Sequence, residues 1–437
     1  ADILSMSKPD VIAEPKKAIQ DAFVNSIKSP GLKEIIQKKI YENENASAVI
    51  VITDNTRPTP YKGESGILLP IVDMLLENGF LAEKILILVA TGTHKPLLQR
   101  ELEAMLDPRI FSLGIPIKNH DSRNDSEIAT LGKTQRGSEI SVNKDYLNAD
   151  LKILTGLVES HFMAGVSGGR KVICPGLVSE KTTHTFHGTE MMLHPNVRDL
   201  VLDENPCHDE SLEIAKSVGA DYTVNVTLDH AYRLTGIFAG NLEAAHRQAY
   251  QKVKEYVSIP IQKEYDIVIT HSGFVGINHY QTAKAAVVSI PVVKKGGTLI
   301  LLADNTDSDP VGSTKYRTCL HLLKLFGTEK FIKLLQSPDW PFVPEQWQVQ
   351  MWMKVFEKIA MENFVYYAPQ VSQEDYAWIP GTDGNTFLPK EKQYKEQKGN
   401  SVHMIQTIIQ GKSRQSPSKI NIAFLADGPY GIPVRQN

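Results

Sequence analysis

Short apolar segments alternate with segments of helical periodicity along most of the chain. Seven segments rich in β-branched residues predict strands, at 46–53, 84–91, 150–156, 221–228, 265–272, 297–304 and 420–427. Most are apolar at consecutive positions, which is typical of parallel strands covered by helices on both faces. Seven segments predict helices, at 65–79, 97–106, 177–187, 241–257, 279–293, 347–362 and 401–411. This alternation predicts an α/β protein with mainly parallel sheets.

The chain of 437 residues is long enough for two or three domains. A boundary is predicted near 258–265, where the segment SIPIQKEYD contains a proline and ends a predicted helix. The segment 368–400 is rich in Pro, Gly, Gln and Lys and has weak periodicity, so we expect a long loop there.

The composition of the chain excludes some classes of binding partner. The net charge is −3 and no long basic or acidic block occurs, which argues against nucleic acid or an anionic membrane as the main partner. No apolar run approaches the roughly 18 residues needed to span a bilayer, and the first residues lack a signal-peptide pattern. Three widely spaced cysteines, Cys174, Cys207 and Cys319, give no disulfide framework. These features predict a cytoplasmic protein.

Polar clusters follow two of the predicted strands, at the end where α/β sheets bind ligands. In TDNTRPTP, Asp54, Thr56 and Arg57 leave a strand together, and Arg57 could bind a carboxylate or phosphate. A structural Asp–Arg pair in a turn is the alternative. In ATGTHKP, Gly92 allows a tight turn and His94 could act as a general base. A capping or surface histidine is the alternative there.

A third cluster, ESHFMAGVSGGRKVICPG at 159–176, follows the strand at 150–156. His161 is followed by Ser167, Gly168, Gly169, Arg170 and Lys171. Adjacent glycines allow backbone N–H groups to approach an anion closely, and Lys171 adds a donor or an amine for covalent attachment. The spacing differs from that of a P-loop. A flexible loop is the alternative, but the combination of residues favours function.

Two further groups could bind ligands. His184 and His187 are three residues apart on one helical face, a feasible but common metal pair. In NHYQTAKA, Gln281 and Lys284 share a face at a helix start and could hold a carboxylate and a hydroxyl. A solvated helix face explains them equally well.

Taken together in this order, the motifs resemble those of the lactate racemase family, the nickel-pincer-nucleotide-dependent 2-hydroxyacid racemases and epimerases. The matching segments are DNTRP, ATGTHKP, ESHFMAGVSGGRKVICPG with a histidine sixteen residues after its lysine, and YQTAK. FAGNLEAAH at 238–246 and a C-terminal ADGPYG extend the resemblance over most of the chain.

The resemblance implies a cofactor and a set of site residues. The cofactor is a nickel-pincer nucleotide, pyridinium-3,5-bisthiocarboxylic acid mononucleotide, which Lys171 could hold covalently. His187 would complete the coordination of its nickel ion. His94 and His161 match the acid and base on opposite sides of the substrate. Arg57, Gln281 and Lys284 match substrate-binding residues. Further matching positions are Asp54, Tyr280 and Trp347 for substrate, and Thr56, Ser167, Gly168, Gly169 and Arg170 for cofactor.

The implied reaction inverts C2 of a 2-hydroxyacid. One histidine takes the hydroxyl proton while hydride leaves C2, the planar 2-oxoacid turns, and the hydride returns to its other face. The substrate is lactate or a more polar acid such as malate, 2-hydroxyglutarate or a sugar acid, because His279 precedes Tyr280 where the lactate enzyme has an aliphatic residue. Two alternatives are a zinc-dependent hydrolase using His184 and His187, and a non-catalytic nucleotide-binding protein.

The resemblance also implies two α/β domains with an active-site cleft between them. The first comprises 1–262 plus 418–437 and binds the nickel nucleotide, while the second comprises 263–417 and contributes substrate-binding residues. The expected partners are a small 2-hydroxyacid and, transiently, cofactor-maturation proteins, without nucleic acid or membrane.

Overall fold

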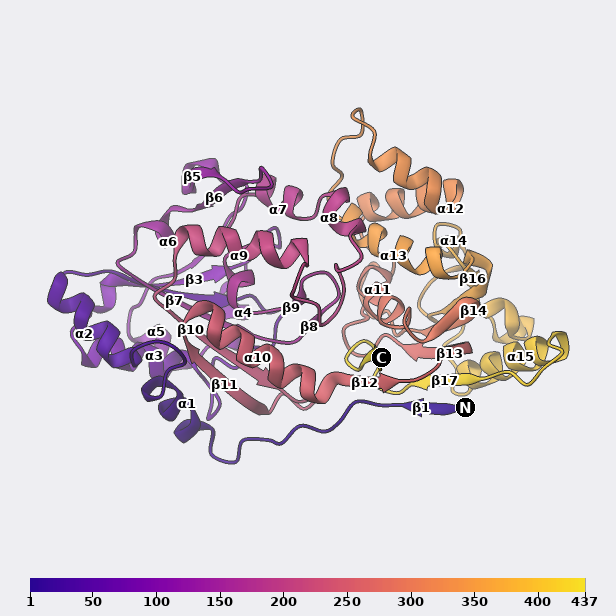
Figure 1. Cartoon of the computed structure of the whole chain (residues 1–437), viewed down its shortest axis with the longest axis horizontal. Coiled ribbons are helices and arrows are strands. Elements are labelled where there is room, and N and C mark those ends of the chain that lie inside the picture. The colour runs from indigo at the N-terminus through magenta and orange to yellow at the C-terminus, as the bar shows by residue number, and fades with distance from the viewer. Residues whose placement is uncertain (437) are drawn as a thin grey trace. The chain divides into compact units, whose positions relative to one another are not determined.

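The computed structural model describes residues 1–436, which form two compact units (Figure 1). The N-terminal unit comprises Lys8–His187 and Pro195–Tyr256. The C-terminal unit comprises Ala1–Ser7, Gly188–His194 and residues 257–436.

The N-terminal unit is built on a six-stranded sheet. Its order is β11–β10–β7–β2–β3–β4, from β11 (Leu234–Gly240), β10 (Tyr222–Leu228), β7 (Leu151–Leu157), β2 (Ala48–Thr53), β3 (Ile85–Ala90) and β4 (Ile117–Asn119). All neighbours pair in parallel except β10 and β11. Val51 pairs with both Leu88 and Leu154, so β3, β2 and β7 run in register toward one edge.

Helices cover both faces of this sheet. Alternate residues of β2, Ala48, Ile50 and Ile52, pack in the core formed with α1 (Pro15–Val24), α2 (Leu32–Glu42), α3 (Leu68–Glu77), α4 (Gln99–Met105) and α5 (Pro108–Ser112). Against other parts of the sheet lie η3 (Gly169–Val172), α9 (Pro206–Val218) and α10 (Leu242–Val257) (Figure 1). The smaller elements are η1 (Ala82–Lys84), η2 (Asp125–Glu127), β5 (Ile128–Lys133), β6 (Glu139–Asn143), α6 (Lys144–Asn148), β8 (Ser160–His161), β9 (Gly165–Val166) and α7 (Glu180–Phe186).

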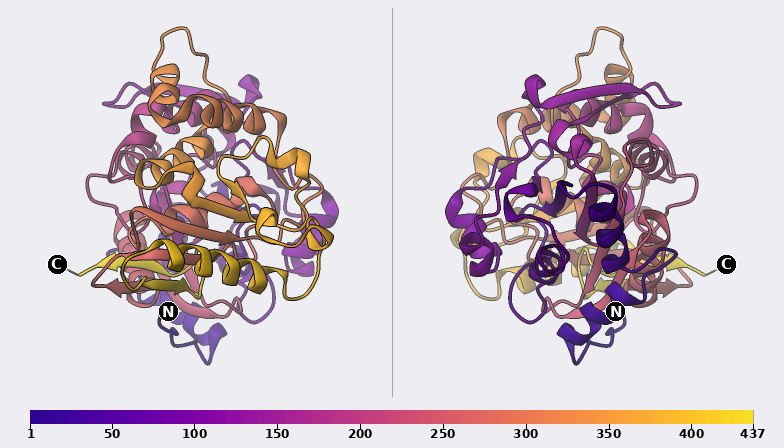
Figure 2. Two further views of the ribbon diagram at one scale, coloured as in Figure 1. Left: turned by 90° about the vertical axis from the view of Figure 1, so that its right-hand side faces the viewer. Right: turned by 90° about the vertical axis from the view of Figure 1, so that its left-hand side faces the viewer.

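The C-terminal unit has a second, wholly parallel sheet. Its order is β1–β17–β13–β14–β15–β16, from β1 (Asp2–Leu4), β17 (Ile422–Leu425), β13 (Tyr265–His271), β14 (Val293–Leu302), β15 (Phe364–Tyr367) and β16 (Thr382–Asp383). The yellow helix α15 (Asn400–Gln415) packs on Ile267, Ile269 and Ile300 of one face (Figure 2). Phe364 and Tyr366 point to the other face, toward α11 (His279–Val288) and α13 (Gln346–Lys358).

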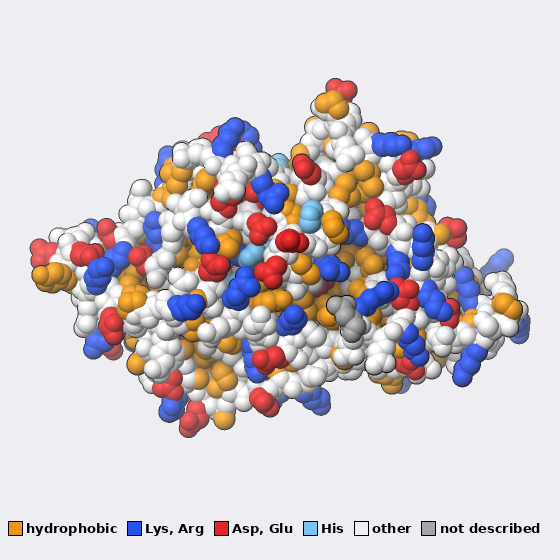
Figure 3. Space-filling view, in the orientation of Figure 1, with side chains coloured by type: hydrophobic (Ala, Val, Ile, Leu, Met, Phe, Trp, Pro, Cys, Tyr) orange, Lys and Arg blue, Asp and Glu red, His pale blue; other side chains and the backbone are white. Residues whose placement is uncertain are grey.

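The remaining elements of the C-terminal unit are short or peripheral. They are α8 (Thr189–Leu193), β12 (Ser258–Ile261), α12 (Thr314–Leu335), η4 (Met361–Asn363), α14 (Gln373–Tyr376), η5 (Gly384–Phe387), η6 (Lys390–Lys392) and β18 (Ile432–Arg435). On the face shown in Figure 3, lysine and arginine side chains are interspersed with acidic ones. None of the helices within residues 1–436 combines the length and apolar character needed to cross a membrane.

The α/β class is confirmed, and all seven predicted strands are present. The prediction that 418–437 returns to the first domain is wrong, because β17 pairs with β13 and β1 inside the second sheet. The N-terminal strand β1 belongs to that same sheet, which also departs from the predicted domain bounds. Sheet order depends on long-range pairing, which local periodicity does not encode.

Candidate active site

The site in the N-terminal unit is formed by loops that follow three neighbouring strands. Asp54, Thr56 and Arg57 follow β2, His94 follows β3, and the segment from His161 to Lys171 follows β7. Since these strands are parallel and adjacent, their carboxyl ends lie at one edge of the sheet. A hydrogen bond between His94 and Asp54 and an ion pair between Arg57 and Glu159 join these loops there.

The first link joins His94 to Asp54. The ring Nδ1 of His94 lies 2.6 Å from Asp54 Oδ2, and the hydroxyl of Thr56 donates to Asp54 Oδ1 at 2.5 Å. Burial alone would raise the pKa of the Asp54 carboxyl, but the hydrogen bonds and charges of its neighbours, His94 first, lower it below the ordinary value. Asp54 therefore stays ionised and orients the His94 ring. Its predicted contact with substrate stays a prediction.

His161 is held in a different way. Its Nδ1 accepts hydrogen bonds from the backbone N–H groups of Met163 and Ala164, both at 3.2 Å. In the neutral ring the proton therefore lies on Nε2. That Nε2 lies 3.3 Å from Nζ of Lys171.

The side-chain amine of Lys171 has an unusually low pKa. Burial, followed by the positive charges of Arg170 and Arg57, lowers the pKa of Lys171 to about 7. The Nζ atom also lies 5.6 Å from the ring centroid of Phe186. A substantial fraction of the side chain is thus the neutral amine near pH 7, the form that a nucleophilic lysine requires.

The two glycines before Arg170 allow close packing against the protein itself. A Cβ on Gly168, whose φ is +70°, would lie 2.6 Å from Val158 Cγ2, and a Cβ on Gly169 would lie 2.6 Å from a ring carbon of His246. The N–H of Gly169 donates to Asn225 Oδ1 at 2.9 Å, and the Ser167 hydroxyl donates to the Leu157 carbonyl at 2.8 Å. The Gly169 N–H is thus bonded to Asn225 within the protein, and the predicted contact of these glycines with a cofactor stays a prediction.

Arg170 also serves the loop. Its buried guanidinium donates to His246 Nε2 at 2.8 Å and to the Ala164 carbonyl at 2.7 Å. Burial lowers the pKa of Arg170 to about 9. The side chain predicted to bind cofactor thus fastens the loop to α10 in this structure, whereas its neighbour Lys171 lies beside His161.

His187 caps the C-terminal end of α7, and its hydrogen bond to the helix fixes the tautomer of its ring. Its Nδ1 donates to the Thr183 carbonyl at 2.9 Å, so the lone pair of the neutral ring lies on Nε2. Burial, followed by the charge of Lys171, lowers the pKa of His187 to about 3. The neutral imidazole is the form that binds nickel, zinc or copper.

A metal site made of protein ligands alone is not found. Within residues 1–436, no three His, Cys, Asp or Glu side chains are grouped so that they could hold a metal ion. A catalytic zinc site normally has three protein ligands. The zinc-hydrolase alternative with His184 and His187 therefore lacks its ligand set in the described chain.

Glu159 was missed by sequence reasoning. Its Oε1 lies 3.2 Å from Nη1 of Arg57, the predicted substrate-binding cation. It is the first residue of the third motif, so the signal available was its place directly after β7. Sequence alone does not show that the loop after β2 brings Arg57 to it.

The remaining predicted substrate residues lie in the C-terminal unit, around the start of α11. The Tyr280 hydroxyl accepts from Trp347 Nε1 at 2.8 Å, which holds these two side chains together. The backbone N–H of Gln281 donates to the Asn278 cap at 3.0 Å, and Lys284 lies one turn further along the helix. Their contact with a substrate stays a prediction.

The argument for a polar substrate from His279 is wrong. His279 is fully buried, and its ring stacks on Trp352 with centroids 4.6 Å apart. Its Nδ1 lies 2.8 Å from the Tyr316 hydroxyl, and burial lowers its pKa to about 3. His279 is therefore a neutral core residue at the start of α11, and its polarity says nothing about the ligand.

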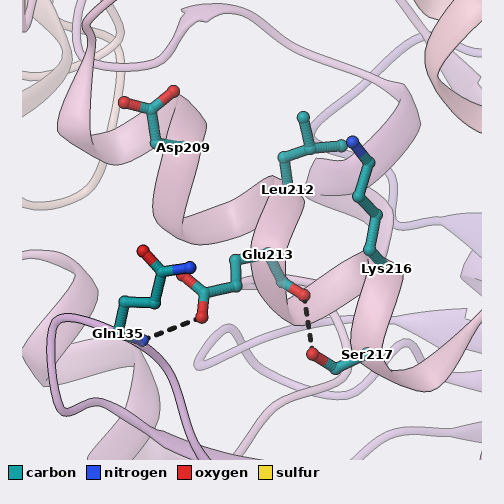
Figure 4. Close-up of a pocket in the computed structure, with 6 residues that line it drawn as sticks. All are labelled: Gln135, Asp209, Leu212, Glu213, Lys216 and Ser217. Atoms are coloured by element: carbon teal, nitrogen blue, oxygen red, sulfur yellow. Dashed lines mark hydrogen bonds between the residues drawn. The ribbon is translucent and has the colours of Figure 1, made fainter.

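A separate hollow of about 430 Å³ lies along α9 (Figure 4). Glu213 crosses it to accept a hydrogen bond from the Gln135 backbone N–H at 2.8 Å. The residues that line this hollow are Gln135, Asp209, Leu212, Glu213, Lys216 and Ser217. None of the predicted site residues is among them, so it is distinct from the strand-end site.

The packing of Gly168 gives a testable prediction. Gly168→Ala combines a left-handed backbone with a clash, whereas Gly137→Ala has a φ of +86° but nothing within 4 Å of the new Cβ. We expect the control to cost about 1 kcal/mol of unfolding free energy and Gly168→Ala about 2 kcal/mol more. Denaturant unfolding measures both, and equal losses would contradict the packing role of Gly168.

Comparison of the sequence with known proteins identifies relatives of this chain. A family model described as the lactate racemase N-terminal domain matches residues 1–199. Lactate racemase of Lactiplantibacillus plantarum is 31% identical over 363 residues, covering 82% of this chain and 81% of that protein. Lactate racemase of Thermoanaerobacterium thermosaccharolyticum is 29% identical over 354 residues, covering 80% and 78%.

Two solved structures share the fold. The lactate racemase apoprotein from Thermoanaerobacterium thermosaccharolyticum has a TM-score of 0.81 at 23% identity, covering 100% of this chain and 94% of that chain. A protein from Thermotoga maritima has a TM-score of 0.61 at 17% identity, covering 93% and 98%. The family resemblance seen in the motifs is confirmed by the relatives: the chain belongs to the lactate racemase family and is an isomerase of the racemase type.

Proposed function

We propose that this racemase inverts the configuration at C2 of a 2-hydroxyacid, with lactate as the foremost candidate substrate. The observation that carries the proposal is the pair of imidazoles, His94 and His161, which are held by opposite kinds of partner in loops after β3 and β7, the two strands that flank β2. The relatives named lactate racemase support lactate. The loss of the His279 argument removes the reason to prefer a more polar acid.

We further propose that the cofactor is a nickel-pincer nucleotide, since the family is nickel-dependent. When bound, it would accept the C2 hydride of the substrate and return it. Two features of the chain fit this group: the neutral His187 ring, with its lone pair on Nε2, and the Lys171 amine, with a pKa of about 7. His187 would supply an imidazole to nickel, and Lys171 would hold the nucleotide, covalently or not.

The acid and base roles follow from the hydrogen bonds. With Nδ1 of His94 donating to Asp54, its Nε2 can accept the substrate hydroxyl proton, and the carboxylate stabilises the resulting imidazolium. With Nδ1 of His161 accepting two backbone N–H groups, its Nε2 carries the proton and can donate it. One ring is therefore prepared to take a proton and the other to give one, as a two-base racemase needs.

Positively charged side chains of the site would bind the substrate carboxylate. Arg57 can bind a carboxylate through its fork of N–H donors. We propose that Gln281 and Lys284 of the C-terminal unit contact the same substrate, with Tyr280 and Trp347 beside them. Transient contact with cofactor-maturation proteins and a cytoplasmic location stay predictions.

Replacing either histidine tests the mechanism. His94→Ala and His161→Ala should each lower racemisation by about 10²–10⁴-fold, while His403→Ala, an exposed residue of α15, should leave it unchanged. In D₂O, the product should keep protium at C2, because the hydrogen moves as hydride. Full activity in both variants, or deuterium at C2, would overturn the proposal, and a wild type without any racemisation would favour the non-catalytic nucleotide-binding protein.

The lowered pKa of Lys171 gives a pH-dependent prediction. Below pH 7 its ammonium form should resist reductive methylation, and above pH 7 the amine should react, with a midpoint near its pKa of about 7. Ordinary lysines titrate near 10.4. Arg57→Met should move the midpoint upward, because the Arg57 charge helps to lower this pKa. Peptide mass spectrometry would follow the reaction, and a midpoint above pH 9 would contradict the account.

A further inference from the structure

The Arg57–Glu159 ion pair is the starting point. Nη1 of Arg57 lies 3.2 Å from Oε1 of Glu159, and the two side chains are 26% and 38% exposed. Both groups can therefore be reached by a small solute. The pair joins the loop after β2 to the segment after β7, at the edge of the sheet where the site lies.

Glu159 is fixed in place by its backbone. Its N–H donates to the Ser167 hydroxyl at 3.0 Å, and its carbonyl accepts from the Ser167 N–H at 2.9 Å. These bonds tie Glu159 to the start of the loop that carries Arg170 and Lys171. The carboxylate thus has a defined position relative to the proposed cofactor-binding loop.

The charged groups near this pair differ in how much charge they can offer to a substrate. The Asp54 carboxylate is engaged by His94 and Thr56, and Lys171 has a pKa of about 7 and so carries only part of a positive charge near neutral pH. Of Arg57, Lys171 and the buried Arg170, Arg57 is therefore the partly exposed side chain that carries a full positive charge. Glu159 already neutralises much of it.

We propose that Glu159 is a specificity-determining residue that restricts the site to monocarboxylic 2-hydroxyacids. The inference rests on the proposed function. A guanidinium has two edges that each present paired N–H donors, so Arg57 can keep Glu159 on one edge and bind one substrate carboxylate on the other. A second substrate carboxylate near Arg57 would meet the charge of Glu159 rather than an unpaired cation.

A purely structural role makes a different prediction. If Glu159 only orients Arg57, its removal should weaken every substrate carboxylate alike. If its charge excludes a second carboxylate, neutralising it should favour dicarboxylates selectively, and mainly through KM. The isosteric variant Glu159→Gln separates these roles because it keeps the side-chain shape.

The experiment compares the cofactor-loaded wild type and Glu159→Gln on lactate, malate and 2-hydroxyglutarate. We expect the ratio of kcat/KM for each dicarboxylate to that for lactate to rise about tenfold, as removal of one like charge at a partly exposed site allows. The wild-type discrimination should also weaken with added salt. Glu139→Gln, which removes a surface pair with Lys181 at 2.7 Å, should leave the ratio unchanged.

Binding of the 2-oxoacids provides a readout that needs no turnover. Calorimetry on the loaded protein should show that Glu159→Gln raises the affinity for 2-oxoglutarate about tenfold relative to pyruvate. An unchanged ratio in kinetics or binding, or an equal loss for all the acids, would overturn the inference. If the wild type racemises none of the acids, the proposed function fails, and the binding ratio still decides the role of Glu159.

Discussion

The site depends on the parallel register of β3, β2 and β7, which brings their carboxyl ends to one edge of the sheet. Parallel pairing of Val51 with Leu88 and Leu154 fixes the three strands in register, so their loops emerge side by side. Two contacts between those loops follow from this, His94 with Asp54 and Arg57 with Glu159. The contact of Lys171 with His161 lies within the segment after β7. Residues far apart in the sequence are thereby held as one group on a rigid sheet.

The loop after β7 divides its polar groups between two tasks. Ser167, Gly169 and Arg170 donate hydrogen bonds to Leu157, Asn225 and His246, respectively, and these bonds fix the loop. That packing surrounds Lys171 and lowers the pKa of its amine. The groups that suggested a ligand-binding loop in the sequence thus support the neighbouring residue, and the chemistry that we propose uses His94, His161, Lys171 and His187.

Sequence reasoning recovered the strands because buried parallel strands are apolar at consecutive positions. It placed Asp54, His94 and His161 at strand ends because each follows such a strand, and their roles there stay predictions. It could not place β17 or β1, since sheet order arises from long-range pairing. Nor could it separate buried Arg170 from neighbouring Lys171, or recognise that His279 lies in an aromatic core. Burial depends on tertiary packing, and so does the contact between Glu159 and Arg57, from which we infer the role of Glu159.

The most direct test of the account is nickel analysis by X-ray absorption of protein produced together with the cofactor-maturation proteins. The neutral His187 ring, with Nδ1 donating to Thr183, predicts nickel with one imidazole nitrogen beside sulfur ligands, and loss of that nitrogen in His187→Ala. Nickel bound with the same ligands in His187→Ala, or a protein without nickel that racemises 2-hydroxyacids at full rate, would contradict it.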